Sequence, residues 1–582
     1  TMRNLKRALS LALASVMLMG MMVVGSSAAS YPDVDDQNHV EAIEVLSAVG
    51  VIVGDNGNFR PEDSVSRNEM AVIMAKLILG TYKADSYVGN HPFNDVPDWA
   101  SRYVAACYNA GIISGRGEGV YDGSSTVTAV EAAAMMLRAL GYEDLSKGAA
   151  QWDQPVAAKA NQINLFEGLA GASNAPMDRN SVAQLALNAL EATMVITEKE
   201  GDIEIPGTIV IPGKITYKTV EAGDSYAYAI DATRGTNAGG FTVQLGEQLY
   251  KGDLKKTTTT DAFERPSTEW SYKSASVNEY AQDADATYTK EVKISDIYRD
   301  LGLSKQVEKN DVVFFVDGEE EADEFKDNDN TTKLSDIALT RNGTHKDVKI
   351  GGNGVLVQAY KKTVSDGQGV KTAVDITIIN TYVLQVDGDY NDKKEELRLS
   401  DLEGVKALPG ATSTKLSSED FANLDTFADE DYVLVTVAKK EIQTIEAAEA
   451  LTETVTAYVA KKGDDNSNSV TAGSTYKYNK NYTAKTYEIG EEYVLVLDKY
   501  GYVVFADGVD AADQYLYVVA ADKQGGVKGN AEAEAYFSDG TSEVITLTSG
   551  SELGDTSNYT DVRAWYSYET KSGGKYELTA LT

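Results

Sequence analysis

The sequence predicts a multidomain protein with a helical first third followed by β-rich modules of the antiparallel sandwich or small-barrel type. Three observations carry this prediction. The chain has 582 residues, enough for several domains. A helical pattern recurs three times between residues 31 and 196. Beyond residue 197, short runs rich in Val, Thr and Tyr alternate with Gly, Asp and Asn turns, which is typical of antiparallel sheets.

The N-terminus has the pattern of a secretory signal peptide. Basic residues precede an apolar run from Leu9 to Val24, and the small residues Ser-Ser-Ala-Ala-Ser follow. We predict that residues 1–29 are a signal peptide cleaved after Ala29. A membrane anchor is disfavoured because the run is short and rich in small residues. The prediction is therefore a secreted protein with no membrane span after cleavage.

The composition excludes several classes of site and partner. With 53 Lys and Arg against 89 Asp and Glu, the net charge of −36 should repel nucleic acid and anionic lipid. The single cysteine, Cys107, rules out a disulfide framework and is expected to be a small core residue. No cofactor is predicted. The acidic run 319–330 is a candidate for structural calcium, but it lacks the ligand spacing and the bidentate Glu of an EF-hand, and a solvated loop is the favoured interpretation.

Residues 54–80, GDNGNFRPEDSVSRNEMAVIMAKLILG, predict a turn, a short extended piece and an amphipathic helix. Ser66 can cap the helix, and Glu69, three positions later, can reach back to the Ser66 N–H. Gly80 ends the helical pattern. The apolar positions at helical spacing are Met70, Ile73, Met74, Leu77 and Ile78. This stretch predicts a helix that packs on a core.

The same arrangement recurs along the first third of the chain. GVIVG (50–54) matches GIISG (111–115) and, more loosely, NLFEG (164–168). The leading segments are YPDV (31–34), FNDV (93–96) and YEDL (142–145). The helix starts are SRNE (66–69), TAVE (128–131) and DRNS (178–181). The repeat predicts three helix–turn–extended loop–helix units, at about 31–80, 91–141 and 142–196.

These units resemble S-layer homology domains, whose pattern runs F-x-D-V, W-A, G-I-I-x-G, G-x-F-x-P and T-R-A-E. The resemblance covers residues 30–196, about a third of the chain. It implies an α-helical pseudo-threefold bundle that binds secondary cell-wall polysaccharide non-covalently. In that family the polymer often carries pyruvylated terminal sugars and lies in grooves between units.

The resemblance implies a ligand role for Arg67 and Arg179, which occupy the arginine position of T-R-A-E. A guanidinium suits this role because its planar fork holds a carboxylate through two bonds and keeps its charge. Ala129 fills the position in the second unit, so that groove is expected to be weak. The alternative for Arg67 is a solvated arginine at a helix start.

Further candidates for polymer binding follow from the same resemblance: Asp33, Asp95, Asp144, Trp99, Trp152, Gly54 and Gly115. The aspartates either contact the sugar or cap a turn of the groove loop. The tryptophans either stack on a sugar or fill the core between units, and the core is favoured because each leads an apolar helix face. The glycines permit close backbone approach.

The remainder is predicted to form β-rich modules at 197–305, 306–450 and 451–582. Strand patterns occur in DVVFFVDG (311–318), GVLVQAYKK (354–362), YVLVTVAKK (432–440) and YVLVLDKYGYVVFADG (493–508). The polar, Tyr-rich stretch 255–302, which contains Pro266 and Trp270, is assigned to the first module with long loops.

No catalytic pattern emerges, so we predict that the chain is not an enzyme. His345 lies in a polar loop without a nucleophile elbow. A glycosidase needs only two carboxylates, but Trp270 and Trp565 are the only tryptophans of the β-rich region.

The predicted function is therefore a surface-layer-like structural protein of the cell wall, anchored by residues 31–196 and a candidate for self-association. The alternatives are an anchored polysaccharide-active enzyme, which a deep carboxylate-lined cleft would favour, and an anchored adhesin. A flat, Tyr-rich exposed patch on one module would favour the adhesin.

Overall fold

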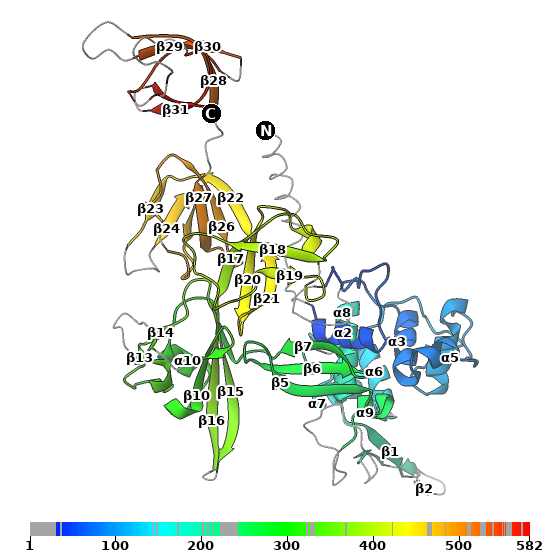
Figure 1. The fold of residues 1–582 in the computed structure, drawn as a ribbon. Helices are drawn as coiled ribbons and strands as arrows, with labels where there is room; N and C mark the ends of the chain where they lie inside the picture. The colour runs from blue at the N-terminus through cyan, green and yellow to red at the C-terminus, as the bar shows by residue number, and fades with distance from the viewer. Residues whose placement is uncertain are drawn as a thin grey trace.

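A computed structural model describes most of the chain (Figure 1). The described residues are 31–581 except 35–37, 144, 147–148, 172–173, 201–202, 206–208, 212–213, 222–241, 322–323, 326–331, 367–368, 422, 462–467, 484, 509–513, 524–530, 538–539, 550, 552, 554–561 and 572–573. The predicted signal peptide and Asp144 lie outside them. Within the described part, no helix has the length and apolar character needed to cross a bilayer.

The N-terminal region is helical, as predicted. Its helices are α2 (Val40–Ala48), α3 (Arg67–Leu79), α4 (Thr81–Asp85), α5 (Asp98–Asn109), α6 (Ala129–Ala139), α7 (Asp153–Gln162) and α8 (Arg179–Glu191). The pairs α2/α3, α5/α6 and α7/α8 belong to residues 31–80, 91–141 and 142–196, called here the first, second and third segments. In α3 the predicted apolar face is buried at Met70, Ile73, Met74 and Leu77 and partly buried at Ile78.

A ring of backbone hydrogen bonds joins the three segments just before their second helices. Val65 N donates to Met177 O at 2.9 Å, Met177 N to Val127 O at 2.9 Å, and Val127 N to Val65 O at 2.8 Å. Each of these residues directly precedes the cap of α3, α6 or α8. The second helices of all three segments therefore start from one common point.

The helical core continues beyond residue 196. The chain forms β1 (Val195–Lys199), β2 (Ile203–Ile205), β3 (Ile209–Ile211), β4 (Ile215–Thr219) and α9 (Leu245–Tyr250). It then forms a three-stranded sheet of β5 (Leu254–Thr260), β6 (Pro266–Tyr272) and β7 (Ala275–Ala281). Leu245, Leu254, Trp270 and Val277 share one hydrophobic core with the helices. The border predicted at 196/197 thus falls inside a continuous core.

Two five-stranded sheets follow. The first, in the order β11-β10-β16-β15-β8, contains β8 (Ala286–Tyr288), β10 (Val312–Val316), β11 (Glu319–Glu320), β15 (Leu356–Asp366) and β16 (Gly369–Ile379). The second, in the order β19-β18-β17-β20-β21, contains β17 (Thr381–Val386), β18 (Glu396–Asp401), β19 (Lys415–Ser417), β20 (Tyr432–Ala438) and β21 (Glu441–Ala447). Since β8 joins β10 in one sheet, the border predicted at 305/306 crosses that sheet.

Three sheets complete the chain. Two of them have three strands: β22 (Glu449–Thr454), β26 (Glu492–Leu497) and β27 (Val503–Gly508), and β23 (Ala457–Val459), β24 (Ser469–Ala472) and β25 (Ser474–Lys477). The C-terminal sheet, in the order β30-β29-β28-β31-β32, contains β28 (Gln514–Lys523), β29 (Ala531–Phe537), β30 (Ser542–Thr546), β31 (Trp565–Lys571) and β32 (Lys575–Ala580). The border predicted at 450/451 falls within β22.

Smaller elements fill the connections. They are β9 (Val292–Lys293), α10 (Ile294–Asp300), η2 (Lys309–Asp311), β12 (Glu324–Phe325), β13 (Thr332–Lys333), η3 (Leu334–Asp336), β14 (Lys349–Ile350) and η4 (Leu424–Thr426). Part of the acidic run 319–330 lies outside the described residues. Across the described part of the chain, no group of three or more His, Cys, Asp or Glu is placed to hold a metal.

The β-rich character of the region is confirmed, and the four predicted strand runs overlap β10, β15, β20, and β26 with β27. One pairing differs from the predicted antiparallel type. Strand β10 runs parallel to β16, with Val312 opposite Val374. The long segment between these strands allows the crossover that parallel pairing requires.

Candidate functional site

Capping side chains fix the starts of α3, α6 and α8, as the sequence predicts. Ser66 Oγ accepts from Glu69 N at 3.2 Å, and Glu69 Oε2 accepts from Ser66 N at 2.7 Å. Thr128 and Glu131 form the same reciprocal box at α6. Asp178 caps α8 without the return bond. The residue after each cap is Arg67, Ala129 or Arg179, so each is held at the ring that joins the segments.

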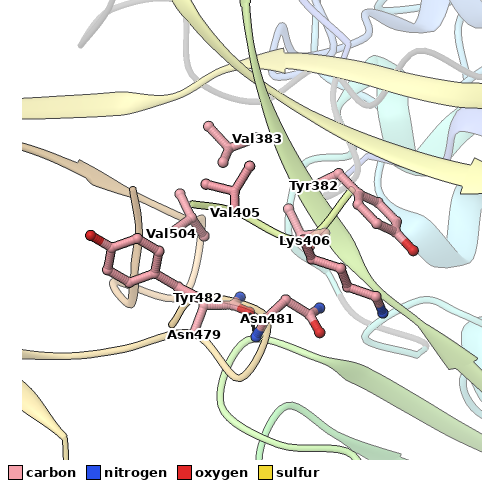
Figure 2. Close-up of a pocket in the computed structure, with 9 residues that line it drawn as sticks. Tyr382, Val383, Val405, Lys406, Asn479, Asn481, Tyr482 and Val504 are labelled. Carbon is pink, nitrogen blue, oxygen red and sulfur yellow. Dashed lines mark hydrogen bonds between the residues drawn. The ribbon is translucent and has the colours of Figure 1, made fainter. Parts of the chain in front are cut away.

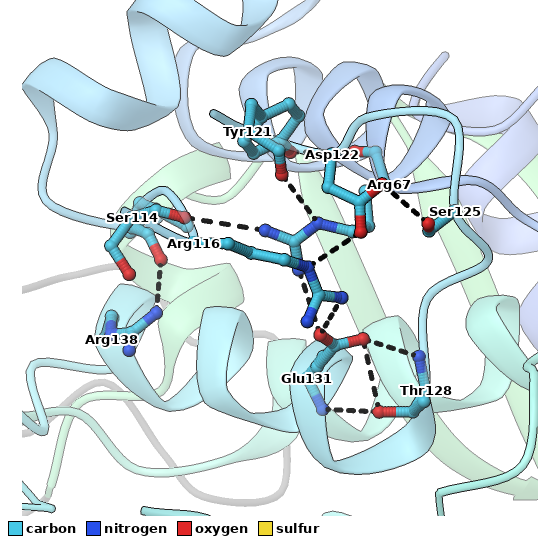
Figure 3. Close-up of polar contacts among 10 residues, drawn as sticks. Arg67, Ser114, Arg116, Tyr121, Asp122, Ser125, Thr128, Glu131 and Arg138 are labelled. Carbon is cyan, nitrogen blue, oxygen red and sulfur yellow. Dashed lines mark hydrogen bonds and ion pairs between the residues drawn. The ribbon is translucent and has the colours of Figure 1, made fainter. Parts of the chain in front are cut away.

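Arg67 is buried, with 6 % of its surface exposed, and reaches into the second segment (Figure 3). Its Nε donates to Tyr121 O at 3.2 Å and its Nη2 to Ser114 O at 3.4 Å. Its Nη1 lies 3.1 Å from Glu131 Oε1, and its guanidinium lies 4.9 Å from the centre of the Tyr121 ring. The alternative of a solvated arginine at a helix start is therefore wrong.

Two further arginines join this group. Arg116 Nη2 lies 2.9 Å from Glu131 Oε1, the same oxygen that Arg67 contacts, and Arg116 Nε lies 2.9 Å from Asp122 Oδ2. Arg138 donates to Ile112 O at 2.8 Å. Burial lowers the pKa of Arg138, and the nearby charge of Arg67 lowers it further. Two arginines thus share the Glu131 carboxylate and a third lies near Arg67, in a chain whose net charge is −36.

Arg179 repeats this docking between the third and first segments. Its Nε donates to Phe59 O at 2.8 Å and its Nη2 to Val53 O at 2.9 Å, and its guanidinium lies 4.7 Å from the centre of the Phe59 ring. Unlike Arg67, it makes no ion pair with any described residue. Burial and the charge of Arg60 lower the pKa of Arg179, and the nearby carboxylates of Glu69 and Asp63 offset part of this shift. Its partly buried guanidinium uses only two of its donors in these bonds and therefore keeps bonding capacity for an anion.

Asp33 and Asp95 hold the loops that receive the arginines. Asp33 accepts from Phe59 N at 2.8 Å and from Arg60 N at 2.6 Å. Asp95 accepts from Tyr121 N at 2.8 Å and from Asp122 N at 2.7 Å. Burial opposes the charged form of Asp95, but these backbone donors outweigh it and hold the pKa of Asp95 below its ordinary value. These aspartates were expected either to contact the sugar or to cap a turn of the groove loop. The geometry of Asp33 and Asp95 supports the second role.

Gly54 and Gly115 are required by packing. A Cβ on Gly54 would lie 2.3 Å from Cε1 of Tyr31 and 2.6 Å from Asn58 O. A Cβ on Gly115 would lie 2.5 Å from Cε1 of Phe93 and 2.6 Å from Val120 O. Each glycine therefore lets the leading aromatic ring lie against the loop that carries the arginine acceptors.

The preferred interpretation of Trp99 and Trp152 as core residues is wrong. Their exposed fractions are 54 % and 48 %. The buried stripe of α5 includes Ala100, Val104 and Cys107, and it begins one position after Trp99. One residue turns a helix by about 100°, which moves Trp99 off this stripe. Both rings are thus accessible to a ligand.

Cys107 is fully buried, as predicted. Burial raises the pKa of its thiol to about 12, so this side chain is an unreactive core residue.

The β-rich region has a small pocket where the second five-stranded sheet meets the segment that follows β25 (Figure 2). Its empty volume is about 200 Å³. The lining residues include Tyr382, Lys406, Asn479, Asn481 and Tyr482, and no carboxylate is among the described residues that line it. Lys406 Nζ lies 5.4 Å from the centre of the Tyr382 ring. The pocket itself supplies no pair of carboxylates of the kind that glycosidases use.

Part of the helical region is similar to a known family. Residues 31–71 and 92–133 match the S-layer homology domain, and residues 142–196 lie outside the match. A "Cell surface protein" of Thermoanaerobacter kivui is 27 % identical over 403 residues, which are 67 % of this chain and 46 % of that protein. The chain thus spans about half the length of this relative.

Two other relatives match over shorter regions. The "Exoglucanase XynX" of Acetivibrio thermocellus is 37 % identical over 17 % of this chain and 9 % of its own length. The "Middle cell wall protein" of Brevibacillus brevis is 26 % identical over 28 % of this chain and 15 % of its own length. A solved structure, "drosophila Unr CSD456", aligns with 35 % of this chain and 99 % of its own, at 8 % identity and a TM-score of 0.11.

Proposed function

We propose that this chain is a surface-layer-like structural protein whose helical region holds it non-covalently on an anionic cell-wall polysaccharide. The S-layer homology match and the relatives named as cell surface and cell wall proteins support a surface protein anchored through these domains. We also propose that the polymer carries pyruvylated sugars and that the chain associates with copies of itself.

Residues 142–196 form a third unit of the same kind in this proposal, and the three units make a pseudo-threefold bundle. The ring of hydrogen bonds through Val65, Val127 and Met177 supports this arrangement. The matching docking of Arg67 and Arg179 onto the loop of a neighbouring segment supports it as well.

One observation carries the binding mechanism: Arg179 is fixed by two carbonyls and an aromatic ring, yet it forms no ion pair with a described residue, because the carboxylates of Glu69 and Asp63 act on it only from a longer distance. A guanidinium held in this way is already oriented for a carboxylate ligand, so less freedom is lost on binding. Val53, whose carbonyl accepts from Arg179, is itself 50 % exposed and offers an apolar contact beside the charge. In our proposal the exposed Trp99 and Trp152 stack on sugar rings of the same polymer.

The test is sedimentation of the full chain with purified cell walls, before and after hydrofluoric acid removes the wall polymer. The chain should pellet with intact walls and remain in solution with stripped walls. Arg179→Ala should shift the chain to the supernatant, whereas Arg341→Ala, an exposed arginine of the β-rich region, should not. If the folded chain stays in the supernatant with polymer-bearing walls, the proposed anchor function is refuted.

In our proposal the β-rich region forms the exposed layer and has no hydrolase activity. The pocket without lining carboxylates supports this view. Assays for reducing-sugar release from wall and plant polysaccharides test it. Release that disappears when a single carboxylate is neutralised would favour the anchored enzyme, a class that some relatives, such as the exoglucanase, are named for.

An anchored adhesin is the second candidate, and one observation favours it. On the C-terminal sheet, Tyr517 lies opposite Tyr536 on one side and Trp565 on the other, so three aromatic side chains form a row across three strands. Tyr536 is 46 % and Trp565 49 % exposed. Such a patch is of the kind used in recognition. Loss of adhesion to host or dietary glycans in a Trp565→Ala chain would support this function.

A further inference from the structure

The sheet of β5, β6 and β7, residues 254–281, connects the helical region with the outer β sheets (Figure 1). We call it the brace. Its sequence makes up the first part of the polar, Tyr-rich stretch 255–302. In the structure the brace has a contact at each end, and the two contacts lie on different parts of the molecule.

The first contact, the base, lies on helix α2 of the anchor. Trp270 is fully buried in the helical core, and its Nε1 donates to Glu41 Oε1 at 2.6 Å. Glu44 Oε2 accepts from Asn278 Nδ2 at 2.9 Å and from Tyr280 OH at 2.5 Å. Two acidic side chains of α2 therefore accept hydrogen bonds from three side chains of the brace.

A second pair strengthens the base. Lys256 Nζ of β5 lies 2.5 Å from Glu191 Oε1 at the end of α8, and 5.5 Å from the centre of the Trp270 ring. The base thus touches both the first and the third helical segments. Because Leu254, Trp270 and Val277 also belong to the helical core, the base is an integral part of that core.

The second contact, the tip, is the turn between β5 and β6. Asp261 accepts from Phe263 N and Arg265 N, both at 2.9 Å, which gives the turn a fixed shape. Phe263 is 6 % exposed and packs with Ile379 and Ala438, which end β16 and β20 of the two outer sheets.

Two polar contacts and one tight approach complete the tip. Glu264 Oε1 lies 2.5 Å from Lys439 Nζ, and Arg265 Nη1 donates to Gln358 Oε1 at 3.3 Å. A Cβ on Gly318 would lie 2.3 Å from Ala262 O, so the backbone of the tip lies directly against the turn after β10. The tip is therefore wedged between the two five-stranded sheets.

We propose that the brace fixes the orientation of the wall anchor relative to the outer β sheets. The base residues Lys256, Trp270 and Asn278 lie side by side on the three strands, four residues from Thr260 and Pro266, where the tip begins. This separation is about 13 Å, and attachment at both places opposes rotation as well as bending. A single covalent connection between domains would permit both motions. The benefit for a surface layer, in which every copy must present its outer sheets at the same angle, rests on the proposed function.

The orientation can be measured by double electron–electron resonance between two spin labels. Suitable labelling sites are Gln154→Cys on α7 and Arg398→Cys on β18, which are exposed and lie on regular elements. Cys107 should stay unlabelled because it is buried and its pKa is raised to about 12. We expect one narrow distance distribution for the full chain.

Two double variants release the brace at one end each: Phe263→Ala with Lys439→Ala at the tip, and Asn278→Ala with Tyr280→Phe at the base. Each should replace the narrow distribution with a broad one, whereas Tyr536→Ala, an aromatic truncation outside the brace, should leave it unchanged. If circular dichroism shows that a double variant unfolds, the single variant Lys439→Ala replaces it at the tip and Tyr280→Phe at the base. Each single variant should also broaden the distance distribution.

A broad distribution in the parent chain, or an unchanged narrow one in the variants of both ends, would overturn the proposal. Sedimentation with cell walls is measured in parallel. Because the distance measurement needs no wall, a failure of wall binding and a failure of the brace give separate results.

Discussion

Replacing Arg67 and Arg179 one at a time should separate the effect on the stability of the anchor from the effect on polymer binding. Both side chains dock on a neighbouring segment through two backbone carbonyls and an aromatic ring. They differ in the charge that faces them. Arg67 has Glu131 as an ion-pair partner, with side-chain exposed fractions of 7 % and 11 % for the pair, whereas Arg179 forms no ion pair with a described residue and has Glu69 and Asp63 only at a longer distance. We expect Arg67→Ala mainly to destabilise the anchor and Arg179→Ala mainly to weaken polymer binding.

The contacts of each arginine give the expected loss of stability and of affinity. Breaking a buried ion pair by removing one partner typically costs 3–5 kcal/mol. Because Arg116 remains 2.9 Å from Glu131, we expect the lower end, about 3 kcal/mol, for Arg67→Ala. Arg179 is only partly buried and loses two bonds to carbonyls and its contact with the Phe59 ring, so about 1–2 kcal/mol is expected. A charge-assisted bond to a polymer carboxylate contributes about 1.5–3 kcal/mol, so Arg179→Ala should weaken binding roughly ten- to a hundredfold.

The assays are urea unfolding of the full chain, followed by helical circular dichroism, and calorimetric titration with solubilised wall polymer. Arg179→Lys is the matched control, since it keeps the charge but not the fork, and it should recover only part of the affinity. The reasoning fails if Arg67→Ala is the more stable variant, or if Arg179→Ala binds like the parent while folded.

Three other substitutions test the remaining contacts. Burial outweighs the donors around Glu44 and raises the pKa of Glu44 above its ordinary value of 4.5. The contribution of Glu44 to stability is therefore complete below pH 4.5 and is lost as the pH rises through the raised pKa. Glu44→Gln should flatten this part of the plot of melting temperature against pH, whereas Glu543→Gln, at an exposed position, should not. Gly115→Ala should cost about 1–3 kcal/mol by overpacking in urea unfolding, whereas Gly508→Ala, where the nearest atom to a Cβ is 3.9 Å away, should be nearly neutral. The pKa of Asp95 is lowered from 3.8, so its contribution is present above that pH and lost as pH falls through the lowered pKa; Asp95→Asn should lower the melting temperature at neutral pH and reduce its fall in acid.

Features set by near neighbours in the sequence could be predicted. The capping boxes of α3 and α6 join residues three positions apart, and both are confirmed. The buried face of α3 and the strands β10 and β20 follow from local periodicity in the same way. The repeat also indicated which positions correspond, which is why Arg67 and Arg179 could be compared before any contact was known.

Contacts between distant parts of the sequence could not be predicted. Arg67 pairs with Glu131, 64 positions away, and Trp270 bonds to Glu41, 229 positions away. Nothing in the local pattern around Trp270 distinguishes a residue of a β module from one that completes a helical core. Trp99 was misassigned because periodicity is ambiguous at a helix start, where a shift of one position moves a side chain from the core to solvent. Arg116 and Arg138 carried no signal beyond their charge.

The three junctions between helical segments carry different charges, and this difference limits how the proposed anchor can work. At one junction Arg67 is neutralised by Glu131, at another Arg179 is unpaired within the described structure, and at the third Ala129 provides no cation. If an unpaired guanidinium is what holds an anionic sugar, each chain has one strong site. A single charged contact of about 1.5–3 kcal/mol cannot by itself keep a protein on a wall. Linking many such sites multiplies their effect, provided that the sites can engage together. Retention would then depend on self-association of the outer sheets and on a fixed angle between those sheets and the anchor, which is the property that the brace supplies.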